Sequence, residues 1–146
     1  MSDIKTKQIT VFSGAVIKDG KILMALRTEE ELPDAHMKWE FPGGKVDFGE
    51  TPAETVVREI YEETGVRAKV IKLIPDVYTS YWNYDWGTQQ TLCFVYLCEF
   101  ISQDEIVEKD HHIDKIDWFE LDKVKDLDCL PGTNEIIALI QKDINP

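Results

Sequence analysis

The sequence predicts one mixed α/β domain, in which helices pack on a sheet that holds both parallel and antiparallel strands. Two observations predict this class. Strand-like and helix-like segments alternate along the chain, and some neighbouring strand-like segments are joined by tight hairpin turns. The length of 146 residues adds a third observation, because it is typical of one domain and no repeat or linker divides residues 1–146.

The first elements are two strand-like runs, residues 9–17 and 21–27, with an Asp-Gly pair between them as a hairpin signal. A polar loop follows over residues 28–38. Residues 39–46 are predicted to form a short strand that runs into a Gly-Gly turn. This part of the chain is therefore expected to supply hairpin-connected strands to the sheet.

A helix over about residues 52–64 is the most clearly marked element. Thr51 is a typical N-cap, Pro52 suits the first helical position, and Glu54 completes a capping box. Gly65 is a natural C-terminal stop. On a helical wheel, the apolar face that we expect to be buried contains Ala53, Val56, Val57 and Ile60.

The second half of the chain continues the alternation of strands and helices. Residues 67–82 and 88–100 resemble two strands around a turn, and residues 115–121 resemble another. Residues 121–127 are predicted to form a short helix, and residues 133–144 an amphipathic C-terminal helix.

Composition limits the classes of partner. The formal net charge is −12, which argues against binding to duplex nucleic acid or to anionic membranes. The three cysteines form no C-x-x-C pair and predict neither a disulfide framework nor a zinc site. The N-terminus lacks an apolar signal core and no long apolar run follows. We therefore expect a soluble, cytoplasmic protein.

Three carboxylates, Glu59, Glu62 and Glu63, crowd a second face of the predicted helix, with only Arg58 nearby to balance them. Like charges four residues apart destabilise a helix, so a plain solvated face explains the cluster poorly. Hard oxygen ligands without Cys or His suit Mg²⁺ or Mn²⁺. The cluster therefore predicts a divalent metal site that faces away from the core.

The segment before this helix supports the metal hypothesis. Gly43 and Gly44 permit close backbone approach, and Glu50 lies immediately before the helix cap, where its carboxylate could join the cluster. A glycine-rich turn that leads to an acidic metal site suits phosphate chemistry, because the metal neutralises developing charge and acidifies water.

The string GKVDFGETPAETVVREIYEETGV, residues 44–66, resembles the Nudix box, G-x5-E-x7-R-E-U-x-E-E-x-G-U, where U is a bulky aliphatic residue. The segment before the box is similar to that of MutT-type nucleoside triphosphate pyrophosphohydrolases, and so is the segment LPGTNEIIALI at residues 130–140. Every fixed position of the box is filled, by Gly44, Glu50, Arg58, Glu59, Ile60, Glu62, Glu63, Gly65 and Val66.

This resemblance implies an α/β/α sandwich around a mixed sheet and Mg²⁺- or Mn²⁺-dependent hydrolysis of a nucleoside diphosphate linked to another moiety. The favoured reaction converts a nucleoside triphosphate, such as an oxidised or non-standard one, to the monophosphate and pyrophosphate. The implied metal ligands are Glu59, Glu62, Glu63 and the carbonyl of Gly44. Glu50 would assist near the metals, Arg58 would orient the glutamates, and Gly43 would help to position phosphate.

The general base stays open at this point. Glu59 is the favoured candidate, and an acid from a later loop is its competitor. By counting back from Trp118, the family's late glutamate falls at His112. Asp110 or Asp114, which flank His112, could supply that carboxylate instead.

Substrate contacts are less determined by the sequence. Arg27 could meet a phosphate or a base, or be a surface arginine. Asn134 matches a purine-contacting asparagine of the MutT-type proteins, but it could equally cap the last helix. His36 could touch substrate or lie in a loop. Aromatic residues could stack a base, line a dimer interface or belong to the core; they are Tyr78, Tyr81, Trp82, Tyr84 and Trp86.

Alternative functions follow from the same resemblance. One is hydrolysis of ADP-ribose, another nucleotide sugar or a dinucleoside polyphosphate. ADP-ribose-type members carry a proline about 15 residues after the box, where this chain has TSYWN, and Tyr84 falls near a tyrosine of dinucleoside polyphosphate members. A non-catalytic nucleotide sensor is a further alternative, against which the intact glutamates argue. The partner is a nucleotide in each case, and the chain is expected to be a monomer or a homodimer.

Overall fold

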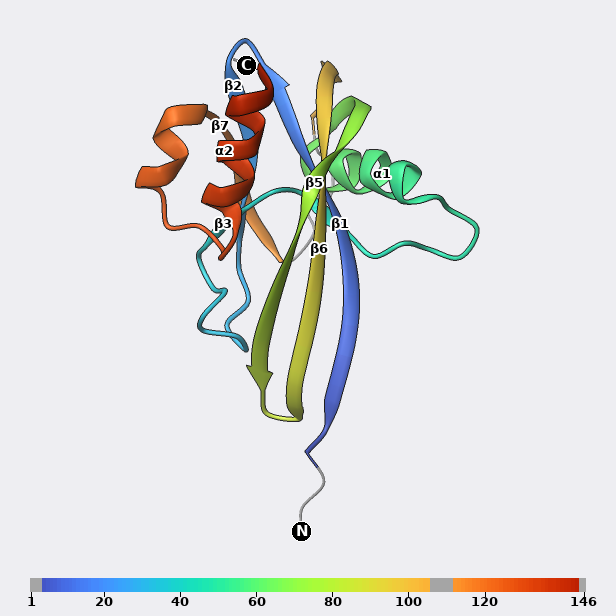
Figure 1. Cartoon of the computed structure of the whole chain (residues 1–146), viewed down its shortest axis with the longest axis vertical. Helices are drawn as coiled ribbons and strands as arrows, with labels where there is room; N and C mark the ends of the chain where they lie inside the picture. The colour runs from blue at the N-terminus through green and yellow to red at the C-terminus, as the bar shows by residue number, and fades with distance from the viewer. Residues whose placement is uncertain (1–3, 106–111, 145–146) are drawn as a thin grey trace.

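The computed structural model describes residues 4–105 and 112–144. Helix α1 lies on one face of a central sheet, and helix α2 with the 3-10 helix η1 lies on the other (Figure 1). The elements in chain order are β1 Thr6–Lys18, β2 Lys21–Arg27, β3 Trp39–Glu40, β4 Gly43–Gly44, α1 Pro52–Thr64, β5 Val66–Tyr84, β6 Gly87–Gln103, β7 Ile113–Glu120, η1 Leu121–Asp126 and α2 Thr133–Ile144.

The sheet has seven strands, ordered β3-β2-β1-β6-β5, with β4 paired to β1 and β7 paired to β2. Strands β1 and β6 run parallel, and the other pairs are antiparallel. The prediction of a mixed sheet between helices is therefore confirmed. No helix in the described part of the chain is long and apolar enough to cross a membrane.

Alternation along the strands divides the core into two layers. Ala15 of β1 belongs to the cluster that packs against α2, and the next residue, Val16, belongs to the cluster that packs against α1. Gly14 allows α1 to lie close to the sheet, because a Cβ at this position would be 2.4 Å from Cδ1 of Ile60. Both helices are thus held against the middle of the sheet.

The lower halves of three strands extend beyond the helices as an arm, formed by residues 6–12 of β1, 77–84 of β5 and 87–94 of β6 (Figure 1). In this arm β5 is the outermost strand. The arm forms one wall of the cavity described below.

The helix bounds 52–64 and 133–144 and the Thr51 capping box are confirmed. The short strand expected after residue 39 is present as β3, but the Gly-Gly turn expected after it is wrong, because Gly43–Gly44 form a second two-residue strand, β4, that joins the sheet. Burial of Val57 is also wrong. Its side chain is 38% exposed, because α1 contacts the sheet along the line through Val56 and Ile60.

Candidate active site

The Gly-Gly pair forms β4, which pairs antiparallel with β1. Gly43 lies opposite Ser13, and Gly44 lies opposite Phe12. A Cβ on Gly43 would lie 2.4 Å from the carbonyl oxygen of Phe12. A Cβ on Gly44 would lie 2.6 Å from Cδ of Glu59. Position 43 therefore requires glycine for reasons of space, whereas a side chain at position 44 would displace the carboxyl group of Glu59, which lies directly beside Gly44.

Glu63 is buried, with 8% of the residue exposed, and its Oε2 accepts a hydrogen bond of 3.1 Å from the backbone N–H of Gly43. The expectation that all three glutamates face away from the core is wrong for this residue. Strand β4 covers this side of α1, and the N–H of Gly43 compensates the carboxylate for part of its lost hydration.

Arg58 is the positively charged side chain around which the carboxylates of the site gather. Its guanidinium binds both carboxylate oxygens of Glu50, at 2.7 and 3.0 Å. One terminal nitrogen donates to Glu59 and to Glu62, each at 3.1 Å. The other lies 3.2 Å from a carboxylate oxygen of Asp47. One cation thus gathers four carboxylates. The hydrogen bonds to Glu50, followed by attraction to Glu59 and Glu62, raise the pKa of Arg58 further above its usual range.

Glu50 is held by more than the arginine. Oε1 also accepts hydrogen bonds from the hydroxyl of Thr55 at 2.9 Å and from the backbone N–H of Asp47 at 3.1 Å. The hydrogen bonds from Arg58, followed by those from Asp47 and Thr55, lower the pKa of Glu50 to about 2. Thr55 was not among the residues predicted from the sequence, although a threonine on the buried side of an otherwise apolar helix face was a usable signal.

The donor chemistry fits a divalent metal. Glu59 and Glu62 converge on one nitrogen of Arg58, and Glu59 also lies beside Gly44, so carboxylate oxygens gather next to the backbone of β4. These are the ligands that Mg²⁺ and Mn²⁺ prefer. Residues 4–105 and 112–144 contain no ready-made group of three or more metal-ligating side chains. In this structure Arg58 supplies the positive charge.

Of the two candidates for the late acidic residue, only Asp114 lies within the described residues. Asp110 lies outside the described residues. Asp114 is an exposed residue of β7, next to Ile113, which pairs with Arg27 of β2. Its role as an additional acid stays a prediction.

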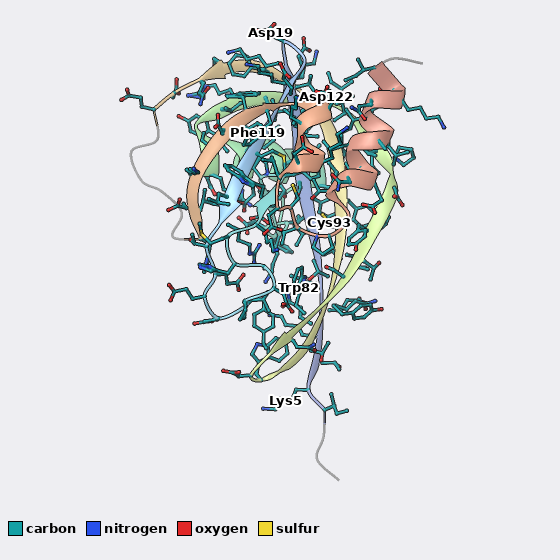
Figure 2. The ribbon with its side chains drawn as sticks, turned by 90° about the vertical axis from the view of Figure 1, so that its left-hand side faces the viewer. Lys5, Asp19, Trp82, Cys93, Phe119 and Asp122 are labelled. Carbon is teal, nitrogen blue, oxygen red and sulfur yellow. The ribbon has the colours of Figure 1, made fainter. Side chains whose placement is uncertain are left out.

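A cavity of about 130 Å³ lies on the opposite face of the sheet from α1, between the arm, the loop after β2 and the start of α2. Tyr78, Trp82 and Tyr84 contribute aromatic rings to its wall. Ser13 lines its inner end and pairs with Gly43, which binds Glu63. A single strand pair thus separates the cavity from the carboxylates. Figure 2 shows Trp82 in the arm and Cys93, which also lines the cavity, nearer the helices.

The polar side of the cavity is an ion network. Arg27 donates to Glu29 at 2.8 Å through Nε, with a second bond from a terminal nitrogen, and to Glu40 at 3.1 Å. Burial disfavours the charge of Arg27, but attraction to Glu40 and Glu29 outweighs it and raises the pKa of Arg27. The hydroxyl of Tyr84 donates to Glu29 at 3.3 Å. The network therefore ties the arm to the loop after β2 and carries one more negative than positive charge.

The remaining candidates lie around this cavity. Asn134 is exposed in the first turn of α2 and is not part of the cavity wall, whereas its neighbour Thr133 is. Base contact by Asn134 therefore stays a prediction. His36 accepts a hydrogen bond of 3.0 Å from the N–H of Glu29 and so stabilises the loop. Tyr81 is 65% exposed on the outer face of the arm, and Trp86 stacks on Tyr84 with ring centroids 5.4 Å apart.

Cysteine chemistry plays no visible part in the site. Cys93, Cys98 and Cys129 are all free thiols in the structure. Burial raises the pKa of Cys98 to about 12 and that of Cys129 to about 11, and it also raises that of Cys93. These thiols are therefore poor nucleophiles at neutral pH.

Comparison with known proteins places the chain among its relatives. An ADP-ribose pyrophosphatase of Bacillus subtilis is 33% identical over 116 residues, which cover 80% of this chain and 57% of that protein. An 8-oxo-dGTP diphosphatase of Escherichia coli is 45% identical over 58 residues, covering 34% of this chain and 45% of that protein. The matches thus span about half the length of these two relatives. An RNA pyrophosphohydrolase of Acidiphilium cryptum is 31% identical over 140 residues, covering 85% of this chain and 81% of that protein.

Solved structures agree with the fold. A NUDIX hydrolase from Nitrosomonas europaea superposes with a TM-score of 0.77 at 21% identity, covering 94% of this chain and 90% of that chain. A MutT NUDIX hydrolase from Burkholderia pseudomallei superposes with a TM-score of 0.69 at 26% identity, covering 92% of this chain and 98% of that chain. The family model of the NUDIX domain matches residues 9–140. The chain belongs to the NUDIX domain family.

Proposed function

We propose that this protein is a divalent-metal-dependent pyrophosphohydrolase that converts a nucleoside triphosphate to the nucleoside monophosphate and pyrophosphate. The observation that carries the proposal is the placement of the box residues. Glu59 and Glu63 meet the backbone of Gly44 and Gly43, and the other side of that strand pair faces an aromatic cavity. A carboxylate cluster and a base-sized cavity on either side of one short strand suit a substrate with a ring at one end and phosphates at the other.

Glu59, Glu62, Glu63 and the carbonyl of Gly44 would hold Mg²⁺ or Mn²⁺. The ion, when bound, would neutralise phosphate charge and make a water molecule more acidic. The side chains of the site would supply the positioning and the proton transfer. Arg58 holds Glu59 and Glu62 in place. Glu59 is our candidate for the base that takes a proton from the attacking water.

The chemical step is a displacement at phosphorus. The water oxygen forms a bond to phosphorus as its proton passes to the base, and the bond from that phosphorus to the bridging oxygen breaks. The leaving group, a nucleotide or pyrophosphate, departs with the bonding electrons. Cationic groups stabilise the charge that spreads over the phosphoryl oxygens in the transition state.

The cavity would take the nucleobase and not the phosphates. Its three aromatic rings offer stacking surfaces, whose contribution is about 1–3 kcal/mol per base by alanine substitution. Arg27 is already paired with Glu29 and Glu40, and the excess negative charge of this network repels phosphate. Of the two roles expected for Arg27, contact near the base is therefore the one we propose.

The test is a substrate screen with Mg²⁺ that identifies products by chromatography. It should include standard and oxidised nucleoside triphosphates, ADP-ribose and dinucleoside polyphosphates. Release of pyrophosphate and nucleoside monophosphate would support the proposal. Hydrolysis of none of these compounds would contradict it.

A residue substitution adds a second test. Glu62→Gln should reduce turnover by orders of magnitude and leave the fold intact, because the amide keeps the size of the side chain but loses its charge. Glu30→Gln is the matched control, since Glu30 is an exposed glutamate in the loop after β2. Turnover of Glu62→Gln equal to that of the control would contradict the metal assignment.

ADP-ribose hydrolysis is the second candidate, and a specific observation favours it. The relative that matches 80% of this chain at 33% identity is named an ADP-ribose pyrophosphatase. Release of AMP and ribose 5-phosphate in the screen would decide for this reaction. The site residues would keep the roles given above, because both reactions break a phosphoanhydride bond.

Three broader expectations from the sequence are kept as proposals. They are a single domain over residues 1–146, a cytoplasmic location, and a chain that is a monomer or a homodimer without affinity for duplex nucleic acid or membranes. A net charge of −12 supports the last of these.

A further inference from the structure

Ser13 is a buried polar residue at the inner end of the aromatic cavity. Only 5% of the residue is exposed, and its side chain lies on the cavity face of β1. The wall at this end also includes Phe41, Val95 and Ile136, which belong to the hydrophobic core beneath α2. The fold therefore places one hydroxyl group among apolar side chains, at a point that a ligand in the cavity can reach.

The hydroxyl of Ser13 has only a weak partner. Among the described residues, its one hydrogen-bonding contact is with Sγ of Cys93 at 4.0 Å, and a thiol is a weak donor and a weak acceptor. Thr133, the other buried hydroxyl of the wall, instead donates to the carbonyl oxygen of Leu130 at 2.8 Å. Buried polar groups are normally paired in this way, because an unpaired one costs free energy. Ser13 therefore keeps a capacity for hydrogen bonding that the protein itself uses poorly.

This hydroxyl lies where the cavity comes nearest to the carboxylates. A Cβ on Gly43 would be 2.4 Å from Oγ of Ser13, so the hydroxyl lies against the backbone of Gly43, whose N–H binds Glu63. A nucleotide that extends from the cavity to the carboxylates must therefore pass close to Ser13. The apolar residues around Ser13 suit the flat base better than the sugar, whose hydroxyl groups would lose hydrogen bonds there.

We propose that Ser13 recognises the nucleobase through a hydrogen bond between its hydroxyl and a polar atom on the edge of the base. This proposal rests on the proposed function in one respect, the placement of a base in the cavity. A serine hydroxyl donates one proton and also accepts, and it rotates to suit its partner. It can therefore meet a carbonyl, a ring nitrogen or an amino group, including an edge that oxidation has changed.

Ser13 would give the cavity a selectivity that its aromatic rings do not provide. Tyr78, Trp82 and Tyr84 offer stacking surfaces, and stacking is open to any flat ring of suitable size. A site built around a hydrogen bond rejects an analogue that lacks the matching polar atom, because its own buried group is then left without a partner. Ser13 would thus favour nucleobases over apolar rings of the same size.

The test is calorimetric binding without metal, so that no turnover is needed. The probes are AMP, GMP, CMP, UMP and the ribonucleoside monophosphate of indole, whose purine-sized ring carries no hydrogen-bonding atom once its nitrogen is joined to the sugar. The variants are Ser13→Ala and, as matched control, Ser80→Ala, because Ser80 is a half-buried serine of the same wall, farther out in the arm.

We expect Ser13→Ala to bind the preferred one of the four natural nucleotides about two- to tenfold more weakly, as for the loss of one hydrogen bond. The affinity of Ser80→Ala should stay within about twofold of the wild type. The wild type and Ser13→Ala should bind the indole compound equally, because its ring offers Ser13 no partner.

Several results would overturn the role of Ser13. One is equal binding of all four natural nucleotides by the wild type and Ser13→Ala, and another is a wild type that binds none of them. An equal loss for the indole compound would show that the hydroxyl binds the sugar or only shapes the cavity, and an equal loss in Ser80→Ala would remove its special place. Melting curves show whether Ser13→Ala is folded, and Ser13→Cys replaces it if it is not. Binding and hydrolysis are measured separately, so this proposal and the proposed function can fail independently.

Discussion

The hydroxyl of Thr55 donates a hydrogen bond of 2.9 Å to Oε1 of Glu50, across the first turn of α1. Thr55 is fully buried, and its hydroxyl uses its one proton to bind this carboxylate. Glu50 in turn binds Arg58 through both oxygens, and Arg58 reaches Glu59 and Glu62. A buried residue at a variable position of the family box therefore helps to position the whole carboxylate cluster.

Thr55→Val tests this positioning role. Valine keeps the shape of the side chain and removes the hydroxyl, so Glu50 loses one donor while the core stays packed. We expect turnover or metal affinity to fall about tenfold, as is typical when a residue that orients a ligand is removed. The measurement is the metal dependence of kcat and KM for the wild type and the variant.

Thr55→Ser is the control for that experiment, because serine restores a hydroxyl at the same position. We expect it to recover most of the lost activity. If Thr55→Ser behaves like Thr55→Val, the effect comes from packing and the hydrogen bond is not important.

The stability of the protein should depend on pH through Glu50. Its pKa is lowered to about 2 in the folded state from the ordinary 4.5, chiefly by hydrogen bonds from Arg58. A carboxyl group with a depressed folded-state pKa stabilises the fold above its unfolded-state pKa and loses that contribution as protons bind. We therefore expect the melting temperature of the wild type to fall as the pH drops from about 4.5 towards 2.

Glu50→Gln isolates this contribution, because glutamine has no titrating carboxyl group. The difference in melting temperature between wild type and variant should be largest near neutral pH and should shrink below about pH 4.5. A difference that stays constant over this range would show that the titration of Glu50 is not coupled to folding.

Added metal should stabilise the folded protein. An ion that binds only the folded state raises its stability by RT ln(1 + [L]/Kd), which is about 1.4 kcal/mol at ten times the Kd. We expect millimolar Mg²⁺ or Mn²⁺ to raise the melting temperature of the wild type without any substrate. The same addition should have a much smaller effect on Glu59→Gln, because that carboxylate lies on the backbone of Gly44.

Sodium chloride at matched ionic strength controls for screening of the acidic surface. If sodium chloride raises the melting temperature as much as magnesium does, the carboxylates do not form a specific metal site.

The helix that carries the site could be predicted because its signals are local. Thr51, Glu54 and Gly65 mark its ends by hydrogen bonds that span a few residues, and the structure contains those bonds. The burial of Glu63 could not be predicted from the wheel, which shows which residues share a face but not what covers that face. Only the pairing of Gly43 with Ser13 brings the backbone N–H that this carboxylate binds.

The cavity could not be predicted either. Its wall combines Leu32 from a loop, Tyr78 and Trp82 from the arm and Thr133 from the start of α2, which are far apart in the chain. The sequence suggested that some of the aromatic residues near β5 stack on a base, but it could not show which ones. The alternation of side chains along β5 shows this, because Tyr78 and Trp82 point into the cavity and Tyr81 points outward.

Trp82→Ala should weaken binding of the nucleobase. Removing a stacking partner costs about 1–3 kcal/mol, which corresponds to a rise in KM of roughly five- to 150-fold. Because Trp82 lies in the arm, on the opposite face of the sheet from the carboxylates of α1, kcat should change little. The measurement is steady-state kinetics on whichever nucleotide the substrate screen identifies.

Trp86→Ala is the matched control, since Trp86 is 41% exposed and is not part of the cavity wall. We expect its KM to stay within about twofold of the wild type, because exposed side chains away from a site contribute little. An unchanged KM in Trp82→Ala would mean that the base binds elsewhere. Equal increases in both variants would instead point to the arm as a whole, because Trp86 stacks on Tyr84, which lines the cavity.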